Sequence, residues 1–564
     1  MTGLSAGLST GLRTAATRWI ADDPCQADRD ELQHALVAAI AGDAEAAADL
    51  AERMGAPLTF GTAGLRGPLR AGAAGMNLAV VRRAAAGIAS YLAADGGTGR
   101  TVVVGHDARH RSAEFAADAA RVLAAAGFTA LLAPGPLPTP ITAFAVQKLN
   151  AAAALQVTAS HNPPNDNGLK VYLAGGAQIV APVDADIEAA IAAVPAAVSI
   201  DASGTPQPWP EDLVQQYLDR VASLPRGSAR ALRIAATPMH GVGGETLVKA
   251  LAQAGFSDVH VVPEQAVPDP DFSTVAFPNP EEPGATDLLL ALAASIGADI
   301  AIANDPDADR CAIGVPLDPS NKGGAWRMLR GDETGVLLGE HVLATLNRAA
   351  HPDPLVATTI VSSELLRHIA SAHGARYDET LTGFKWIVRA GDGAGTGLVY
   401  GYEEALGHCV DPDAVRDKDG ISAAMLMCDL AAGLKAAGRT LQGALDDLAR
   451  AHGLHLTDQL SVRVEDLSLI RDAMARVRSG PPSVLAGEDV TEVTDILPRT
   501  DAVVLRSHHR RVVVRPSGTE PKLKCYLEVV TAVDPGAADL TAARAQAAAD
   551  LAQLRSDIAA VLGL

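Results

Sequence analysis

The chain has 564 residues, more than one hydrophobic core supports, and this length predicts three to five domains of roughly 100–200 residues each. Its formal net charge of −20 argues against a nucleic-acid surface or an anionic membrane as a general partner. Aromatic residues make up only 3% of the chain, so Ala, Leu and Val must fill the cores. In so acidic a chain, a local cluster of Arg and Lys is a candidate anion site.

The cysteine usage favours a reducing compartment, because the five cysteines form no CxxC pair and no regular framework. They are Cys25, Cys311, Cys409, Cys428 and Cys525. The N-terminal segment lacks the apolar stretch of a signal peptide, and no apolar run is long enough to cross a bilayer. We therefore expect a cytoplasmic protein, a monomer or dimer, that binds neither membranes nor nucleic acids.

Residues 1–55 are rich in alanine, and the apolar spacing in 32–40 predicts amphipathic helices. Residues 60–67, with the sequence FGTAGLRG, place three glycines around Arg66. This stretch either allows close approach of the backbone to a ligand or forms a plain hairpin loop. Two GxSxG matches at 3–7 and 7–11 follow no strand, so neither is a nucleophile elbow.

A strand–helix–strand pattern then occurs three times, each with Gly just after the helix as a C-cap. The units are strand 101–104, helix 112–126 and strand 129–132; strand 233–236, helix 244–254 and strand 259–262; and strand 355–360 and helix 363–373 before a further strand. Such units form parallel sheets with helices on their faces. The sequence therefore predicts three similar α/β domains.

From about residue 454 the pattern changes to strands separated by polar turns, at 459–464, 502–505, 511–514 and 524–530, followed by a helix over 539–562. This order predicts a separate α+β domain. We place the four domains at residues 1–210, 211–325, 326–453 and 454–564.

Residues 158–170, with the sequence TASHNPPNDNGLK, follow an apolar run over 151–157 that predicts a buried strand. Ser, His, Asn, Pro and Gly favour an ordered loop here. Ser160 therefore lies just past a strand end, where open α/β sheets place their chemistry. Taken alone, the stretch is also compatible with an Asn/Pro-rich surface turn.

The acidic loop of residues 304–310 follows a second apolar run, 300–303. Asp305, Asp307 and Asp309 stand at alternate positions and can converge on one hard cation. An EF-hand would need Gly at Arg310 and Glu at Pro316, so that calcium motif is absent. Mg²⁺, which takes few protein carboxylates together with a phosphate oxygen, suits this loop better.

The basic loop of residues 515–524, RPSGTEPKLK, is the clearest candidate anion site in this acidic chain. Arg515 offers a fork for two phosphate oxygens, and Ser517 and Thr519 add hydroxyl groups. Gly518 allows backbone N–H groups to form a nest, and Lys524 adds a second cation.

Three further loops are ambiguous on their own. Glu403 and Glu404 follow the strand 398–400 and either accept hydrogen bonds from sugar hydroxyls or form a solvated turn. Lys385 and Lys418 stand in short Gly-containing loops, GFK and DKDG. The Gly-rich stretch 391–397 precedes a strand instead of following one, so we interpret it as a turn and not a dinucleotide loop.

TASHNPPNDNGLK, DPDADR, EEALG and RPSGTEPKLK occur in the order seen in the α-D-phosphohexomutase family, which the chain resembles over nearly its whole length. FGTAGLRG, TPMHGVGG at 237–244 and DKDG are most similar to the branch that contains phosphopentomutases. The resemblance implies three three-layer α/β domains and a C-terminal α+β domain around a central cleft. In chain order, the four domains would hold the phosphoserine loop, the metal loop, the sugar-binding loop and the phosphate-binding loop.

The resemblance also implies a mutase mechanism. The phosphorylated Ser160 would give its phosphoryl group to a sugar phosphate, forming a bisphosphate, and would take the other phosphate back. Ser160, Asp305, Asp307 and Asp309 would hold Mg²⁺, and a sugar bisphosphate would act as activator. The candidate substrate-binding residues are Arg66, Arg310, Lys385, Glu403, Glu404, Lys418, Arg515, Ser517, Gly518, Thr519 and Lys524.

For acid/base work, Lys170 and His408 are the candidates, with His161 less favoured and assigned to supporting the loop. Two features of the sugar loop point in different directions. Ala405 stands where many hexomutases have a serine, as in the pentomutase-like branch, whereas His408 is similar to the mannose-type and hexosamine-type enzymes. We therefore expect transfer between C6 and C1 of an aldohexose, with transfer between C5 and C1 of a pentose as the alternative. A phosphatase and a non-catalytic sugar-phosphate sensor are more remote alternatives.

Overall fold

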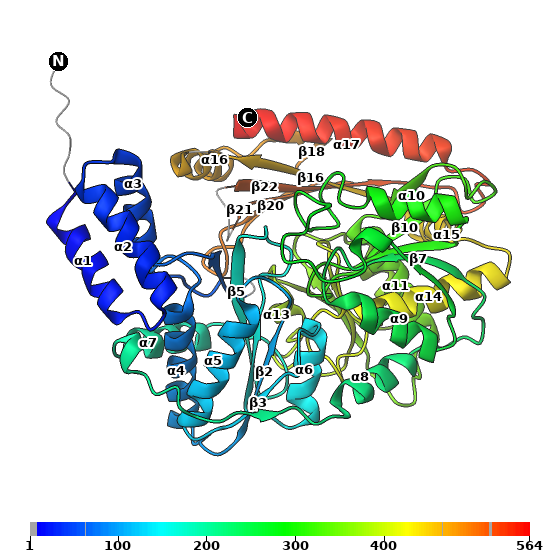
Figure 1. Cartoon of the computed structure of the whole chain (residues 1–564). Helices are drawn as coiled ribbons and strands as arrows, with labels where there is room; N and C mark the ends of the chain where they lie inside the picture. Colours follow the sequence, from blue (N-terminus) through cyan, green and yellow to red (C-terminus); the bar gives the residue numbers. More distant parts are fainter. Residues whose placement is uncertain (1–7, 62–63, 465, 518–521, 564) are drawn as a thin grey trace. The chain divides into compact units, whose positions relative to one another are not determined.

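The computed structural model describes residues 8–61, 64–464, 466–517 and 522–563 (Figure 1). The chain divides into two compact units. The first comprises Met1–Pro225, Arg233–Cys311 and Asp411–Met425, and the second comprises Arg226–Leu232, Ala312–Val410 and Leu426–Leu564. The central cleft implied by the resemblance stays a prediction.

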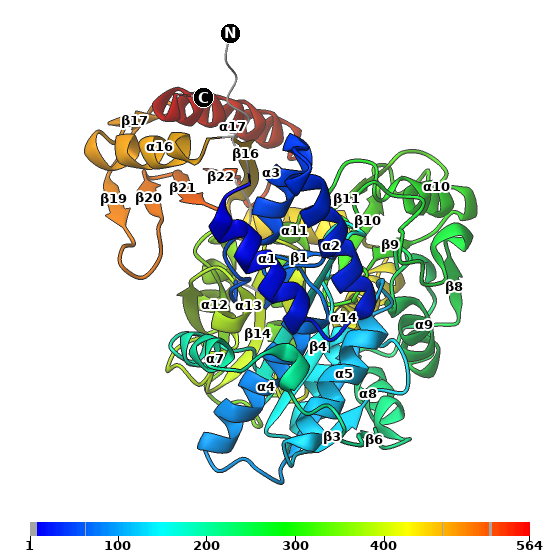
Figure 2. The same cartoon turned by 60° about the vertical axis from the view of Figure 1, so that its left-hand side comes forward.

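The first unit begins with three helices, α1 (Thr10–Asp22), α2 (Gln26–Ile40) and α3 (Ala44–Arg53), seen in dark blue in Figure 2. Leu32, Leu36 and Leu50 form the centre of their own small core. An ion pair of 2.6 Å between Asp28 and Arg111 ties α2 to the first α/β domain. The helices predicted for the N-terminal segment are confirmed within the described residues, while the first GxSxG match lies outside them.

The first sheet has the order β1-β5-β4-β2-β3-β6. Its strands are β1 (Leu65–Pro68), β2 (Thr101–His106), β3 (Thr129–Leu132), β4 (Ala153–Val157), β5 (Asp166–Leu173) and β6 (Gln207–Pro208). Successive side chains of a strand point to opposite faces. Accordingly, Val102 and Val104 pack in the core with α4 (Leu78–Ala94) and α5 (Ser112–Ala125), whereas Gly105 lies against α6 (Thr139–Lys148).

Two sequence-based expectations for this sheet need correction. The sheet is mixed, because β5 runs antiparallel to both β4 and β1. The stretch 158–170 is also not a loop throughout, since β5 begins at Asp166 and includes Lys170. The reason is that the segment from Leu169 to Leu173 is mostly apolar and largely buried, so it pairs antiparallel with the buried strand β4 as a hairpin. This hairpin brings Lys170 back beside the serine loop.

A second parallel array in the first unit has β7 (Arg233–Thr237) between β8 (Asp258–Val261) and β9 (Ile300–Ala303). The helices associated with it are α8 (Leu213–Ala222), α9 (Gly243–Gln253) and α10 (Asp287–Ile296). All four residues of β9 are buried, and the strand leads directly into the acidic loop. A buried strand end therefore fixes where that loop starts.

The second unit contains a four-stranded sheet in the order β13-β12-β14-β15. Its strands are β12 (Leu355–Thr359), β13 (Arg376–Thr380), β14 (Leu398–Glu403) and β15 (Gly407–Cys409), and β15 is antiparallel to β14. Tyr400 and Tyr402 lie against α11 (Gly331–Thr345), whereas Gly401 meets Ile387 of α13 (Phe384–Ile387) on the opposite face. The third predicted strand–helix–strand unit is confirmed, again in a mixed sheet.

The C-terminal domain is an antiparallel sheet in the order β16-β22-β21-β20-β19. The strands are β16 (Leu454–Arg463), β19 (Glu492–Asp495), β20 (Val503–Arg506), β21 (Arg510–Pro516) and β22 (Lys522–Thr531). One face packs against α16 (Leu467–Ser479) and α17 (Thr541–Leu562) in a core that includes Leu527 and Leu554. Helix α16 was not predicted, whereas the α+β class and the C-terminal helix are confirmed.

Within the described residues, no single helix is long and apolar enough to cross a membrane. Helices α14 (Gly420–Ala436) and α15 (Leu441–His452) meet that criterion only as a pair bent by 89°.

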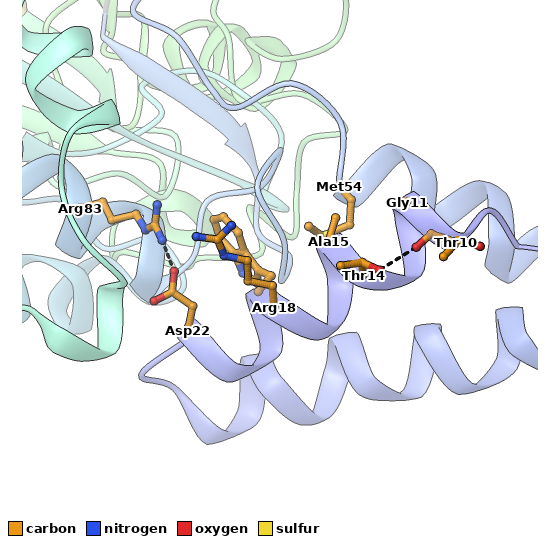
Figure 3. A pocket seen from close by; sticks show the side chains of 9 residues that line it. Thr10, Gly11, Thr14, Ala15, Arg18, Asp22, Met54 and Arg83 are labelled. Carbon is orange, nitrogen blue, oxygen red and sulfur yellow. Dashed lines mark hydrogen bonds and ion pairs between the residues drawn. The ribbon is translucent and has the colours of Figure 1, made fainter.

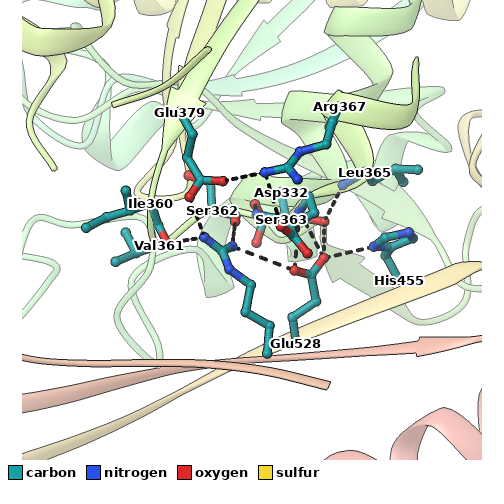
Figure 4. Close-up of polar contacts among 12 residues, drawn as sticks. Asp332, Ile360, Val361, Ser362, Ser363, Leu365, Arg367, Glu379, His455 and Glu528 are labelled. Atoms are coloured by element: carbon teal, nitrogen blue, oxygen red, sulfur yellow. Dashed lines mark hydrogen bonds and ion pairs between the residues drawn. The ribbon is translucent and has the colours of Figure 1, made fainter. Parts of the chain in front are cut away.

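The other face of the C-terminal sheet docks on the third α/β domain through a small apolar cluster and a buried polar network (Figure 4). Glu528 of β22 accepts hydrogen bonds from Ser363 Oγ at 2.6 Å and from the backbone N–H of Glu364 at 3.1 Å. His455 Nδ1 lies 2.9 Å from Glu528 Oε1, and Arg511 Nη1 lies 3.8 Å from Oε2. One carboxylate thus joins two domains of the second unit.

Two carboxyl groups in this network are perturbed in opposite directions. Burial alone would raise the pKa of Glu528, but His455, Arg511 and Ser363 outweigh it and lower this pKa to about 2. Burial raises the pKa of Asp332 to about 6, although the N–H of Ser363 opposes the shift. The ionised form of Glu528 therefore stabilises the docked fold, whereas ionisation of Asp332 destabilises it.

We predict that Glu528→Gln lowers the stability of the second unit by roughly 1–3 kcal/mol near pH 7. Because the folded-state pKa of Glu528 lies below the unfolded-state value of 4.5, this difference should shrink as the pH falls below 4.5. Urea titrations at neutral and acidic pH, with hydrogen exchange of the β22 amides as the probe of unfolding, measure this stability difference.

The matched control is Asp332→Asn, because the folded-state pKa of the Asp332 carboxyl is raised instead of lowered. The stabilising effect of the Asp332 carboxyl is complete below its unfolded-state pKa of 3.8 and is lost as the pH rises through about 6. Asp332→Asn should therefore cause no loss of stability at neutral pH. An equal loss of stability in both variants at every pH would contradict the opposite roles assigned to the Glu528 and Asp332 carboxyls.

Candidate active site

Ser160 lies in the turn after β4 with its backbone in the left-handed region, at φ 55°, and its side chain is buried. Such a conformation is strained for a residue other than glycine and persists only when its surroundings hold it. Ser160 N–H donates to Thr158 Oγ1 at 2.9 Å, and Ser160 Oγ donates to Asp305 Oδ2 at 2.9 Å. The hydroxyl is therefore aimed at the acidic loop.

Asp305, Asp307 and Asp309 are all fully buried, and one carboxylate oxygen from each lies within 4.8 Å of the others. In the described part of the chain, Asp307 Oδ1 and Asp309 Oδ1 are buried without a hydrogen-bond partner. Buried carboxylate oxygens that converge without donors fit a hard cation, because Mg²⁺ and Ca²⁺ take oxygen ligands. These carboxylate oxygens are therefore suitable ligands for the expected metal, and the Ser160 hydroxyl lies beside them.

Two ammonium groups also reach this cluster. Lys170 Nζ lies 2.7 Å from Asp307 Oδ2 and 2.5 Å from Asp309 Oδ2, and Lys418 Nζ lies 3.1 Å from Asp309 Oδ2. Burial and the neighbouring carboxylates raise the pKa of Asp305 to about 8. Burial would also raise the pKa of Asp309, but Lys170 and Lys418 outweigh it and lower this pKa. The carboxyls of the cluster thus have unequal proton affinities.

Neighbouring segments fix the acidic loop. Thr139 Oγ1 donates to Asp307 Oδ2 at 2.6 Å, and Val242 N–H donates to the Pro306 carbonyl at 2.8 Å. Gly420 N–H donates to the Ala308 carbonyl at 3.1 Å, and a Cβ atom at Gly420 would lie 2.2 Å from the Arg310 carbonyl oxygen. Only glycine fits this close approach. Sequence reasoning missed Thr139, since a single threonine beside prolines carries no distinctive pattern.

Three predicted residues lie around the serine loop. Arg66 of β1 donates to Asn162 Oδ1 at 3.1 Å, and Arg310 Nη1 is 3.3 Å from Glu281 Oε2. His161 Nδ1 lies 3.3 Å from Ser160 Oγ, and burial together with Arg310 and Arg66 holds its pKa well below the ordinary value. The first unit therefore brings together Ser160, the three aspartates and these basic groups.

The sugar loop lies in the second unit at the end of β14. Glu404 Oε2 accepts from Ser362 Oγ at 3.1 Å and from Thr359 Oγ1 at 3.2 Å, while Glu403 is the last residue of β14 and is partly exposed. Lys385, on α13, is also partly exposed. His408 is fully buried, with Nδ1 3.3 Å from the hydroxyl of Tyr400. Its role in acid/base work stays a prediction.

Arg515 and Lys524 are directly opposite each other on β21 and β22, with Ser461 of β16 beyond Lys524 in the same row. Cross-strand partners share a face, so two cations stand together where like charges repel unless an anion lies between them. Arg463 and Lys522 form the next row on that face. Sequence reasoning had not singled out these two, although the strand alternation relates Lys522 to Lys524.

The remaining predicted members of this site lie at the end of β21. Ser517 N–H donates to the Lys522 carbonyl at 2.8 Å. Gly518 and Thr519 lie outside the described residues. Among those residues, Arg515 Nε is buried and has no hydrogen-bond partner.

A surface pocket of about 570 Å³ lies beside α1 (Figure 3). Thr10, Thr14 and Arg18 line it from α1, and the ion pair between Asp22 and Arg83 closes one end. None of the predicted site residues lines this pocket. The residues that line the pocket belong to the N-terminal helical segment and to α4, and none of them belongs to the serine loop or the acidic loop.

Comparison with protein families accounts for most of the chain. All four domain models of the phosphoglucomutase/phosphomannomutase family match the chain in order. They are the α/β/α domain I over residues 57–197, domain II over 215–317, domain III over 330–452 and the C-terminal domain over 463–558. The chain belongs to this family. It is therefore a phosphosugar mutase, an isomerase that moves a phosphoryl group within a sugar phosphate, and the fold class predicted from the sequence is confirmed.

Similar proteins carry several substrate names. A "Probable phosphomannomutase" of Haemophilus influenzae is 42% identical over 82% of this chain and 95% of its own length. A "Probable phosphoribomutase" of Schizosaccharomyces pombe is 33% identical over 92% of this chain and 93% of its own length. A crystal structure assigned to a phosphomannomutase from Thermus thermophilus aligns with a TM-score of 0.68 at 26% identity, covering 88% of this chain and 100% of that one.

We predict that Gly420→Ala displaces the acidic loop, because the added Cβ would overlap the Arg310 carbonyl. The variant should need at least about tenfold more Mg²⁺ for half-maximal activity, corresponding to about 1.4 kcal/mol of lost binding. Activity measured as a function of Mg²⁺ concentration tests this.

The control is Gly433→Ala in α14, where a Cβ meets nothing within 4 Å. That change should leave the Mg²⁺ requirement unaltered and stabilise the helix by roughly 0.5–1 kcal/mol. Equal Mg²⁺ requirements in both variants would show that the close approach at Gly420 does not position the loop.

Proposed function

We propose that the chain interconverts the 1-phosphate and 6-phosphate of an aldohexose through a phosphorylated Ser160. The observation that carries the proposal is the buried Ser160 hydroxyl, held 2.9 Å from Asp305 at the edge of a three-carboxylate cluster. Phosphoryl transfer needs an oxygen nucleophile beside concentrated positive charge, which a cation at this cluster supplies.

In the first half-reaction, the bond between phosphorus and Ser160 Oγ breaks, and a bond from phosphorus to a sugar hydroxyl oxygen forms. The acceptor hydroxyl gives up its proton to a general base, Ser160 Oγ takes up a proton as it leaves phosphorus, and a sugar bisphosphate results. After the bisphosphate turns over, Ser160 Oγ accepts the other phosphoryl group and restores the phosphoenzyme. Dissociation of the bisphosphate leaves an unphosphorylated enzyme, so added bisphosphate acts as activator.

Asp305, Asp307 and Asp309, with Ser160, would hold Mg²⁺, which when bound neutralises charge on the phosphoryl group. Lys170 and Lys418 already contact Asp307 or Asp309 and would keep those carboxylates oriented. Arg66 and Arg310 are proposed to contact the substrate from the same unit. These roles follow from their placement around Ser160.

For proton transfer we favour His161, whose Nδ1 is 3.3 Å from Ser160 Oγ, over His408, which is buried against Tyr400. Lys170 stays a candidate. Arg515, Ser517, Gly518, Thr519 and Lys524 are proposed to grip the phosphate that is not in transit. Glu403, Glu404 and Lys385 are proposed to contact the sugar.

The choice of a hexose is supported by the identity of 42% to the relative named as a phosphomannomutase, against 33% to the one named as a phosphoribomutase. Transfer between C5 and C1 of ribose or deoxyribose is the alternative, favoured by Ala405 in the sugar loop. We also propose the domain boundaries 1–210, 211–325, 326–453 and 454–564, since each family match falls within one of these ranges.

We predict that the active protein carries one phosphate on Ser160 and that Ser160→Ala abolishes mutase turnover. Intact mass and peptide mapping locate the phosphate, and a coupled assay with glucose, mannose and ribose 1-phosphates measures turnover. The control is Ser199→Ala, remote in sequence and in the short 3-10 helix Ala197–Ser199. Turnover by Ser160→Ala at the wild-type rate would refute the mechanism, and release of inorganic phosphate in place of the isomer would indicate a phosphatase.

We also predict distinct effects for the two loops of the second unit. An Arg-to-phosphate hydrogen bond is charge-assisted and contributes roughly 1.5–3 kcal/mol, so Arg515→Ala should raise KM about tenfold to a hundredfold for every accepted sugar phosphate. Glu403→Gln should instead change the ranking of the sugars, because it is proposed to contact hydroxyl groups. Steady-state kinetics on the three 1-phosphates distinguish these effects. The reverse pattern would mean that the two loops are wrongly assigned.

A further inference from the structure

Arg109 lies in the turn between β2 and α5, and its side chain is buried, with 4% of the residue exposed. Buried arginines normally face carboxylates or phosphates. Most partners of Arg109 are instead backbone carbonyl oxygens, and all four of these belong to residues 160–166. That segment is the loop that carries Ser160.

The four contacts use both terminal nitrogens of the guanidinium. Nη2 donates to the carbonyls of Ser160 at 2.7 Å and Asn162 at 2.6 Å. Nη1 donates to the carbonyls of Pro163 at 2.7 Å and Asp166 at 3.2 Å. Among the described residues, no other donor is recorded for the carbonyls of Ser160 and Asn162.

The guanidinium is itself held from the other side. Its Nε lies 3.3 Å from Asp107 Oδ2, and Asp107 Oδ1 accepts from Arg109 N–H at 3.0 Å and from Ser112 Oγ at 2.6 Å. The guanidinium carbon lies 4.9 Å from the centre of the Phe272 ring. Both terminal nitrogens of the side chain therefore donate to backbone oxygens, while the ion pair with Asp107 and the packing on Phe272 hold the guanidinium from the other side.

This arrangement addresses a physical problem of the loop. Four carbonyl dipoles converge on one buried point, which is unfavourable unless a cation occupies it. Ser160 also has the left-handed backbone, at φ 55°, and a serine does not hold that conformation unaided. The contacts of Arg109 satisfy the carbonyls on both sides of the turn and thereby fix where Ser160 Oγ points.

From these contacts we infer that Arg109 is a positioning residue for phosphoryl transfer, which sets the orientation of Ser160 through its carbonyl group and touches no substrate. The inference rests on the proposed function, in which Ser160 carries the phosphoryl group. Because Ser160 must be aligned both when it donates and when it accepts, the same clamp serves both half-reactions. A misplacement of about 1 Å can lower a rate by about 100-fold.

The central experiment compares Arg109→Ala with Arg82→Ala. Arg82 of α4 is a matched control, since it makes a bidentate pair with buried Asp118 at 2.8 and 2.6 Å in the same domain but contacts no part of the serine loop. Both changes remove a guanidinium that pairs with a buried carboxylate, fully buried at Arg109 and partly buried at Arg82, and both lower stability. For Arg109→Ala we expect kcat to fall roughly 100-fold with KM changed by less than about threefold. For Arg82→Ala we expect kcat to be unchanged.

Two further measurements separate positioning from a merely structural role. Free guanidinium, at roughly 50 mM and far below denaturing concentrations, should restore at least about tenfold of the lost kcat in Arg109→Ala and none in Arg82→Ala. The ³¹P resonance of phosphoserine 160 should shift in Arg109→Ala and stay unchanged in Arg82→Ala. Arg109→Lys, which offers three donors from one point in place of a planar fork, should resemble Arg109→Ala in kcat and also supplies a test if the alanine variant does not fold.

A kcat for the Arg109 variants within about threefold of wild type would overturn the inference, as would loss of kcat without guanidinium rescue and without a ³¹P shift. Failure of the proposed function is distinguished by Ser160→Ala. If that variant turns over, Ser160 is not the phosphoryl carrier. If Ser160→Ala is inactive while Arg109→Ala keeps wild-type kcat, only the inference on Arg109 fails.

Discussion

The confinement of three carboxylates at one buried strand end is the constraint on which the first unit depends. With oxygens within 4.8 Å of each other, each ionised pair of Asp305, Asp307 and Asp309 repels by about 3–4 kcal/mol at an effective dielectric constant of about 20. Lys170 and Lys418 offset part of this repulsion by direct contact. The remaining oxygens without donors make the cluster a candidate cation site, and Asp305 places it against the Ser160 hydroxyl.

The second unit follows a different principle. Its two candidate ligand loops are formed at strand ends, and the domains that carry them are joined by Glu528, which receives donors from Ser363 and the backbone of Glu364. A buried carboxylate that is fully hydrogen-bonded makes docking sensitive to its own ionisation. One face of the C-terminal sheet packs in the domain's own core, and the opposite face docks through a small apolar cluster together with the Glu528 network, with Arg515 and Lys524 farther along that face.

Family membership and the site geometry support the same class of chemistry independently. The matches extend through all four domains, while the contacts of Ser160, Asp305 and Arg109 show how the first unit holds the Ser160 hydroxyl. In the proposed function the sugar contacts the loop after β14, where Glu403 and Glu404 precede Ala405. That loop combines features of two branches, so specificity is a matter for kinetics.

The sequence by itself determined the domain class, the strand that precedes Ser160 and the acidic loop after β9, because apolar runs and alternating carboxylates are local patterns. It also determined the basic loop after β21, since a charge cluster is visible without a fold. Only the tertiary structure decided that Lys170 lies on a strand, that His408 is buried, and that Thr139 and Arg109 hold the two loops. These facts depend on contacts between segments up to 168 residues apart, and no local pattern records such contacts.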